Sequence, residues 1–330
     1  MELVTDYWNT TKRAPRSPAG QEHPGTAHIF RAVPPSAALA ALTTGLIDYA
    51  GLFPPAALDM ASAVAKYDAY LRSPPEQRAL LGRFVVTVAR LDELAEAAAP
   101  YFAQDKERPW RLSVLGGAEL EADARAVRAF NTAMAGAAVA DVVETRAMSR
   151  DGILAAANVH DPEALFIEIP SASDPAPLLE YIARAGAGAK IRTGGVVPDA
   201  IPPSADVGRF LLACAAADVR FKATAGLHHP MRAARALTYE ADSPTAIMHG
   251  FLNVFLAAAL ARAGGAAADM AALIGETARA AVRFDDAGVT WRSRRFPTAQ
   301  LRDARADFAI SFGSCSFCEP IEDLVALGLL

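Results

Sequence analysis

Short apolar runs alternate with alanine-rich segments along most of the chain, and this alternation limits the fold more than any other feature of the sequence. The apolar runs are rich in β-branched residues, and the segments between them have the length and composition of helices. Such alternation predicts repeated strand–helix units and a parallel sheet. Eight strands are expected, at Leu46–Phe53, Arg83–Val88, Arg111–Leu115, Ala138–Val143, Leu165–Ile169, Ala189–Arg192, Arg220–Ala225 and Phe308–Phe312.

Eight parallel strands with helices between them predict an α/β fold, the (β/α)8 TIM barrel. A length of 330 residues suits one such barrel with additions. A doubly wound sheet with a helical extension is the alternative fold, but no GxGxxG motif follows the first expected strand. The helices expected between strands include Ala61–Leu71, Leu120–Met134, Pro177–Ala185 and Ala205–Ala217.

The domain organisation follows from where this alternation begins and where it is interrupted. Residues 1–30 are polar, contain proline, glycine and charge without any period, and are expected to form a flexible arm. Residues 31–330 are expected to form the single barrel domain, with a long helical insertion at about 227–307 between the seventh and eighth strands. Because the apolar segment Phe251–Leu260 within it would promote association if exposed, we expect the insertion to cover the barrel mouth or a subunit interface.

Composition and charge exclude several classes of function. The net charge is −5, with both signs dispersed along the chain, so no basic surface is expected for nucleic acid. No apolar stretch approaches the roughly 20 residues of a membrane span, and no secretory signal is recognisable. Three cysteines are too few for a disulfide framework. We therefore expect a cytoplasmic protein without a cofactor, whose partner is a small-molecule substrate and which can form a homo-oligomer.

Two lysines lie in the middle of neighbouring apolar strands, where charged residues are rare. Side chains alternate along a strand, so Lys190 shares a face with Arg192, and Lys222 shares one with Thr224. Each lysine could instead extend outward to solvent or pair with a buried carboxylate. If both point inward, each ammonium group disfavours the charge of the other, and one lysine can be a free amine near neutral pH. A free amine is the nucleophile that Schiff-base formation requires.

Four short segments lie on the expected strands or directly after them: Ala140–Val143 (ADVV), Lys190–Gly194 (KIRTG), Phe221–Gly226 (FKATAG) and Phe312–Ser316 (FGSCS). They resemble motifs of the class I aldolase family of TIM barrels that includes deoxyribose-phosphate aldolase, and they occur in the family's order on the corresponding strands. The resemblance implies an aldolase-like lyase that forms a Schiff base with a small carbonyl or keto-acid compound.

The resemblance also implies a role for individual residues. Lys190 would be the Schiff-base nucleophile, Lys222 the neighbour that lowers its pKa, and Asp141 a proton shuttle. Glu168, at the end of its strand, is a further catalytic candidate. The residues expected to bind substrate or an anion are Arg192, Thr193, Gly194, Thr224, Gly226, His228, Gly313, Ser314 and Ser316.

Two departures from the family pattern bear on the substrate. Gly226 is followed by Leu227, His228 and His229, where the family has a second glycine and an arginine. Arg192 replaces a small residue beside the catalytic lysine. Both changes disfavour a phosphorylated sugar, and Arg192 favours a carboxylate instead, which an arginine can hold through two hydrogen bonds.

Two other functions remain open from the residues alone. Glu168 with His228 or His229, and with Asp48 as a further inward carboxylate, could serve a metal-dependent hydrolase, isomerase or lyase. Because adjacent side chains of an extended segment point in opposite directions, at most one of the two histidines is expected to face the site. The third alternative is a non-catalytic barrel that binds a metabolite and uses the lysines as anion anchors. The isolated Cys315–Cys318 pair predicts no zinc site, because no second pair accompanies it.

Overall fold

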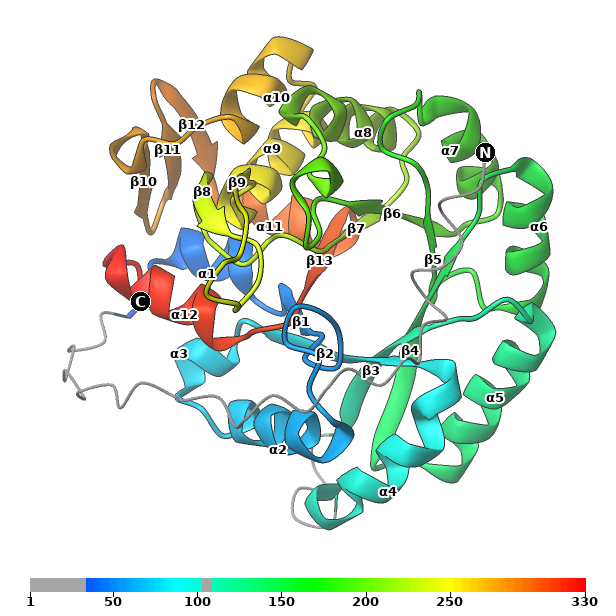
Figure 1. The fold of residues 1–330 in the computed structure, drawn as a ribbon. Coiled ribbons are helices and arrows are strands. Elements are labelled where there is room, and N and C mark those ends of the chain that lie inside the picture. The colour runs from blue at the N-terminus through cyan, green and yellow to red at the C-terminus, as the bar shows by residue number, and fades with distance from the viewer. Residues whose placement is uncertain (1–33, 103–108) are drawn as a thin grey trace. The chain divides into compact units, whose positions relative to one another are not determined.

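Eight parallel strands close into a barrel, which confirms the predicted (β/α)8 TIM fold (Figure 1). The computed structural model describes residues 34–102 and 109–330, so the expected arm at 1–30 lies outside the described residues. Around the barrel the strand order is β1, β13, β7, β6, β5, β4, β3, β2. Their bounds are β1 Ile47–Tyr49, β2 Leu81–Thr87, β3 Trp110–Leu115, β4 Ala138–Arg146, β5 Leu165–Glu168, β6 Gly188–Arg192, β7 Phe221–Thr224 and β13 Ala309–Ser314. Each expected strand overlaps one of these eight.

Helices lie around the outside of the ring of strands (Figure 1). Side-chain caps define where several of them begin: Asp59 accepts a hydrogen bond from the backbone N–H of Ser62 at the start of α2, and Ser149 accepts one from Gly152 at the start of α6. As far as β7, the helices are α1 Ala37–Thr43, α2 Met60–Leu71, α3 Pro75–Arg78, α4 Leu91–Phe102, α5 Leu120–Ala133, α6 Arg150–Val159, α7 Ala176–Arg184 and α8 Ser204–Ala216, with 3-10 turns η1 Val88–Arg90 and η2 Pro198–Ala200.

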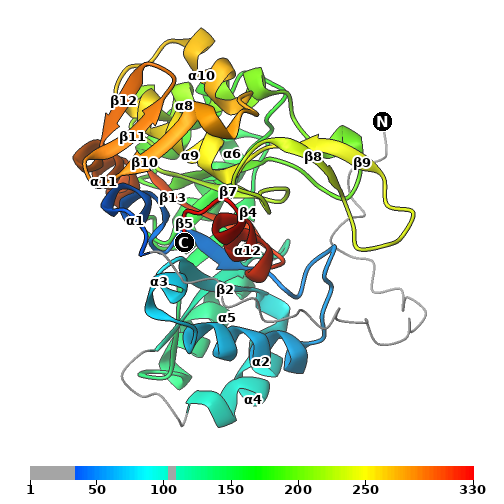
Figure 2. The same cartoon turned by 90° about the vertical axis from the view of Figure 1, so that its left-hand side faces the viewer.

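The segment between β7 and β13 contains two small antiparallel sheets in addition to the helices expected there. A hairpin of β8 and β9 comes first, and a three-stranded sheet of β10, β11 and β12 follows and contacts α1 and α11 (Figure 2). The elements are β8 Ala233–Ala236, β9 Thr245–Met248, α9 Phe251–Arg262, α10 Ala267–Ile274, η3 Arg279–Ala281, β10 Val282–Asp285, β11 Gly288–Trp291, β12 Arg294–Pro297 and α11 Thr298–Asp307; α12 Cys318–Ala326 follows β13.

The apolar helix α9 is covered, although on a different face from the one expected. All residues from Phe251 to Ala261 are buried. Phe251 stacks on Phe312 of β13, and Phe255 stacks on Phe221 of β7. The helix therefore belongs to the layer around the barrel wall, whereas the expectation was the barrel mouth or a subunit interface. Within residues 34–102 and 109–330, no helix combines the length and apolar character needed to cross a membrane.

Candidate functional site

Strand register places both lysines on one level of the barrel. Glu168 of β5 pairs with Lys190 of β6, and Lys190 pairs with Lys222 of β7. The side chains of Lys190 and Lys222 are only 4% and 2% exposed. Phe221, next to Lys222 in β7, packs outward against Phe210 of α8. Because side chains alternate along a strand, Lys222 points into the barrel, and Lys190, its partner in register, does so too.

Glu144 of β4 lies between the two ammonium groups and contacts both. Its Oε2 is 2.6 Å from Lys190 Nζ, and its Oε1 is 2.7 Å from Lys222 Nζ. Lys190 Nζ also lies 3.0 Å from Glu168 Oε2, and Lys222 Nζ lies 2.7 Å from Asp48 Oδ2. The lysines are therefore linked by carboxylates into one buried network of ion pairs, in which neither ammonium group lacks a partner.

Smaller polar groups complete this network. Ser113 donates a hydrogen bond to Glu144 Oε1 (2.6 Å) and accepts one from Lys222 (2.9 Å). Ser311 donates to Asp48 Oδ2 (2.7 Å), and the backbone N–H of Arg83 donates to Asp48 Oδ1 (2.7 Å). A buried polar network is stable only when each polar group has a hydrogen-bond or ion-pair partner, and these contacts provide such partners.

The electrostatics of the network keep Lys190 charged. Burial alone raises the pKa of a carboxyl group and lowers that of an amine, but opposite charges at contact distance outweigh it here. Lys190 and Lys222 hold the pKa of Glu144 well below its usual range. Lys190, Arg192 and Arg146 lower the pKa of Glu168 to about 2. Glu144 and Glu168 in turn raise the pKa of Lys190, so the carboxylates offset the lysine–lysine repulsion on which the expectation of a free amine rested.

Two arginines at the C-terminal ends of their strands contact Glu168. Arg146, the last residue of β4, contacts Glu168 Oε1 at 2.6 Å, and Arg192, the last residue of β6, does so at 3.6 Å. Their side chains are 38% and 35% exposed. Thr224 and Gly313 pair in register beside Arg192. The Glu168 carboxylate is thus shared between the buried Lys190 and two partly exposed guanidinium groups.

Asp141 does not join the lysines, contrary to expectation. Its carboxylate contacts Arg83 at 2.6 Å and Arg111 at 2.5 Å, and both arginines lie near the beginnings of their strands. The β3–β4 register shifts here, since Leu112 pairs with Ala140 and Ser113 pairs with Val142. Asp141 is therefore the extra residue of a β-bulge, and the bulge changes which later side chains of β4 face inward. Glu144, three residues further along, takes the position between the lysines.

The turns after β6 and β7 hold the two strand ends together. The Thr193 hydroxyl donates to the carbonyl oxygens of Ala225 (2.6 Å) and Thr224 (3.1 Å). A Cβ on Gly194 would lie 2.8 Å from Gly226 Cα, and Gly226 has φ +75°. The structure thus gives Thr193, Gly194 and Gly226 a role in close backbone packing, and the Thr193 hydroxyl is already bonded within the protein.

A second group of polar residues surrounds His228, just beyond β7. His228 Nδ1 lies 3.2 Å from Glu319 Oε2, 3.3 Å from Ser314 Oγ and 4.0 Å from Cys315 Sγ. Burial alone lowers the pKa of His228, but its contacts with Cys315 and Glu319 raise it to about 10. Ser316 accepts a hydrogen bond from the backbone N–H of Glu319 and so helps to begin α12.

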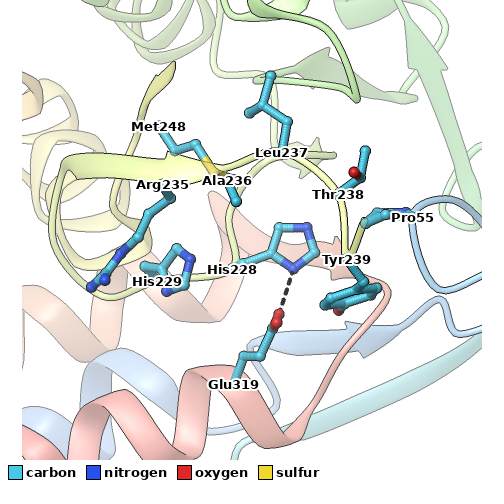
Figure 3. A pocket seen from close by; sticks show the side chains of 10 residues that line it. All are labelled: Pro55, His228, His229, Arg235, Ala236, Leu237, Thr238, Tyr239, Met248 and Glu319. Carbon is cyan, nitrogen blue, oxygen red and sulfur yellow. Dashed lines mark hydrogen bonds and ion pairs between the residues drawn. The ribbon is translucent and has the colours of Figure 1, made fainter. Parts of the chain in front are cut away.

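Both histidines of the LHHP segment line one pocket of about 210 Å³, whereas at most one was expected to face a site (Figure 3). His229 Nδ1 contacts Asp323 Oδ2 at 2.7 Å, and His228 contacts Glu319, so each ring meets a different carboxylate of α12. The other lining residues are Pro55, Arg235, Ala236, Leu237, Thr238, Tyr239, Met248 and Glu319.

The arrangement does not gather the residues expected for a metal site. Glu168 lies among Lys190, Arg146 and Arg192, a cationic environment that disfavours a metal ion. The two histidines bind carboxylates of α12 instead. In the part of the chain that the structure describes, no group of three histidine, cysteine or acidic residues could hold a metal ion.

Sequence reasoning missed the central carboxylate and several of its neighbours. Glu144 and Arg146 lie in the segment VVETR, beyond the expected end of the strand at Val143. Ser113 and Ser311 are small polar residues within apolar strands. A glutamate directly after the apolar run of a barrel strand was the available signal. Comparisons of the chain with protein-family models, curated proteins and solved structures give no match.

Proposed function

We propose that the protein is a Schiff-base-forming lyase that acts on a small carbonyl compound with an anionic group, and that Lys190 is its nucleophile. The observation that carries this proposal is the pair of buried lysines bridged by Glu144 inside the barrel. Barrel interiors are ordinarily filled by branched apolar side chains. Replacing buried ion pairs by apolar residues is often neutral or stabilising, so a network of this kind supports a chemical role.

Lys190 is better placed than Lys222 to meet a substrate. It contacts Glu168, which the two partly exposed arginines also contact from the ends of their strands. Lys222 is enclosed by Asp48, Glu144 and Ser113. Because active sites of TIM barrels lie at the C-terminal ends of the strands, a carbonyl compound that enters there reaches Lys190 first.

The same contacts offer a route for the proton that Lys190 must lose. Its resting ammonium group cannot attack a carbonyl carbon, but Glu168 and Glu144 lie within hydrogen-bonding distance and can accept a proton. An anionic substrate that binds Arg146 and Arg192 would weaken their attraction for Glu168 and raise its pKa. Proton transfer from Lys190 to Glu168 then becomes easier at the moment when substrate is bound.

The neutral amine of Lys190 can then add to the carbonyl carbon. The carbonyl oxygen takes up a proton and the amine loses one, which gives a carbinolamine. Glu168, as a carboxylic acid, protonates the hydroxyl group of the carbinolamine, and the departure of water leaves a protonated imine.

As the resemblance to class I aldolases implies, the imine accepts the electron pair of the carbon–carbon bond while the Glu168 carboxylate takes the proton of the β-hydroxyl group. One fragment leaves as an aldehyde, and the other stays on Lys190 as an enamine. Protonation of the enamine and addition of water then release the second carbonyl compound and restore the amine. Glu144 replaces Asp141 in this proposal as the carboxylate nearest to both lysines.

Trapping with sodium borohydride tests this proposal on a small set of amines. The chain has five lysines, Lys12, Lys66, Lys106, Lys190 and Lys222. Incubation with short aldehydes and 2-oxo acids, followed by reduction and peptide mass spectrometry, should place a secondary amine on Lys190. Lys190→Met should abolish this adduct. Lys66→Met, which removes an exposed lysine, is the matched control and should leave it unchanged.

Two results would contradict the assignment. Absence of an adduct in the wild-type protein across the panel would count against Schiff-base chemistry. An adduct that persists in folded Lys190→Met and maps to Lys222 would show that the other lysine is the nucleophile. Far-UV circular dichroism of each variant establishes that it is folded before the adducts are compared.

A further inference from the structure

The pocket around His228 is distinct from the lysine network. None of its ten lining residues belongs to the set of lysines and carboxylates inside the barrel. Its walls come from the β8–β9 hairpin, from the segments after β1 and β7 and from α12 (Figure 3). It therefore needs an explanation of its own.

The chain reaches this pocket through an unusual backbone turn. Ala225 has φ +60° and Gly226 has φ +75°. A left-handed conformation costs a non-glycine residue roughly 1–2 kcal/mol, and such strain is concentrated at functional sites. The turn directs His228 and His229 toward α12, where each ring meets a carboxylate.

The contacts of His228 leave one ring nitrogen directed away from its partners. Nδ1 faces Glu319, and Figure 3 shows the opposite side of the ring turned toward the residues of the hairpin. A carboxylate that holds one nitrogen of a histidine fixes the ring and makes the other nitrogen available to a ligand. Although burial lowers the pKa of His228, its contacts with Cys315 and Glu319 raise it and favour the imidazolium. Both ring nitrogens of an imidazolium carry a hydrogen, so Nε2 can donate to a ligand while Nδ1 donates to Glu319.

Both carboxylates at the pocket are held by a histidine, whereas the guanidinium group at the pocket makes only one long contact with the residues that the structure describes. Glu319 is engaged by His228 and Asp323 by His229. Arg235 reaches Asp323 only at 3.6 Å, and its side chain is 45% exposed. The guanidinium of Arg235 can accordingly take a second partner. The apolar lining residues Pro55, Leu237 and Met248 suit a ligand with a hydrocarbon part.

We propose that this pocket binds a small carboxylate, whose oxygens accept hydrogen bonds from His228 Nε2 and the Arg235 guanidinium while its short apolar chain contacts Leu237 and Met248. The volume of about 210 Å³ is below the usual range for drug-sized ligands, so the ligand has only a few carbon atoms. This inference stands apart from the proposed lyase activity, because a saturated carboxylate cannot form a Schiff base.

Isothermal titration calorimetry with butanoate tests the inference. Butan-1-ol has the same chain length without the charge, and inorganic phosphate has the charge without the chain; both should bind at least tenfold more weakly. His228→Gln and Arg235→Gln should each weaken butanoate binding about tenfold to a hundredfold, as expected for the loss of a charge-assisted hydrogen bond. Arg235 is on a half-exposed hairpin position, so its variant tests the site without disturbing the core.

Lys190→Met and Arg192→Gln serve as controls for binding inside the barrel and should bind butanoate as the wild type does. Loss of binding in these two variants, with retention in His228→Gln and Arg235→Gln, would place the carboxylate in the barrel and overturn the inference. Equal affinity for phosphate and butanoate would overturn the carboxylate assignment. Undetectable binding of butanoate to the wild type at millimolar concentration would overturn the site itself, whatever the borohydride experiment shows.

Discussion

At the scale of single residues, Glu144 is the side chain on which the charge balance of the barrel depends. It contacts both lysines, while Asp48 contacts only Lys222 and Glu168 only Lys190. Without Glu144, the two buried ammonium groups would face each other, and each would keep only one carboxylate partner. A like charge lowers the pKa of a neighbouring amine, and Glu144 counteracts this effect, so that the lysines stay charged and unreactive in the resting protein. Glu168 is then the carboxylate whose pKa a bound anion can change.

Glu168 should make the stability of the protein depend on acid pH. Lys190, Arg192 and Arg146 lower its pKa from 4.5 to about 2 against the opposing effect of burial. A carboxyl group with a depressed folded-state pKa stabilises the protein fully above its unfolded value and loses that contribution as pH falls toward the folded value. About 3 kcal/mol should therefore be lost between about pH 5 and pH 2. Urea unfolding across this range measures it.

Glu168→Gln is the comparison for this experiment, since glutamine keeps the size of the side chain and does not titrate. Its free energy of unfolding should fall less steeply between pH 5 and pH 2 than that of the wild type. The remaining slope reflects the other carboxyl groups whose pKa is depressed, among them Glu144, Asp141 and Glu319. Equal slopes for the two proteins would show that Glu168 does not carry the ionic contribution assigned to it.

The residues of the site were predictable to different degrees, for identifiable reasons. Lys190, Lys222 and Glu168 could be placed from the alternation of side chains along regular strands. Asp141 and Glu144 could not, because the bulge at Asp141 breaks that alternation within β4 and no sequence signal marks it. The pairing of His228 with Glu319 joins residues 91 positions apart, and contacts at such separation depend on tertiary packing.

At the scale of elements, two glycines let the turns after β6 and β7 touch. Gly226→Ala should destabilise the protein through two effects. Its φ of +75° strains any side chain, and the new Cβ would lie 2.8 Å from Gly194 Cα. Gly136 is a matched control, since it has φ +83° and no atom within 4 Å of an added Cβ. Gly136→Ala should cost about 1 kcal/mol.

Gly226→Ala should cost at least about 2 kcal/mol more than the control, because overpacking against backbone is added to the strain. Unfolding midpoints in urea give both values. Similar losses in the two variants would show that the turns after β6 and β7 can separate without cost, and that the close approach does not hold the mouth of the barrel together.

The elements between β7 and β13 show what local sequence pattern can and cannot specify. Helix α9 is apolar on every side, and this uniformity correctly indicated burial. The strands of the two small sheets are four residues long, too short for a clear period of two. The sequence of β8, AARA, favours helix by intrinsic propensity. Pairing with β9 decides its conformation, and such pairing is set by the fold as a whole.

At the scale of the whole molecule, the number of strand–helix units predicted a barrel, but closure of the barrel depends on pairing between strands far apart in the sequence. The barrel closes where β1 pairs with β13, through partners such as Ile47 and Phe312. Nothing in either strand specifies the other. Eight units nevertheless predict closure because a parallel sheet of this size buries its edges when the first and last strands meet. The additional sheet of β10, β11 and β12 is joined to this body through α1 and α11.

This arrangement predicts that the barrel and the added three-stranded sheet unfold together. Trp110 on β3 and Trp291 on β11 are both 4% exposed and belong to one continuous core cluster, and the described residues 34–102 and 109–330 belong to one compact unit. Two variants, each retaining one of these tryptophans and carrying phenylalanine at the other positions, report the two regions separately. In each variant, fluorescence and far-UV circular dichroism should give the same urea midpoint, as a single cooperative transition requires. If the fluorescence of Trp291 changes at lower urea than the circular dichroism of the same variant, the sheet of β10, β11 and β12 unfolds on its own, and the shared core does not couple it to the barrel.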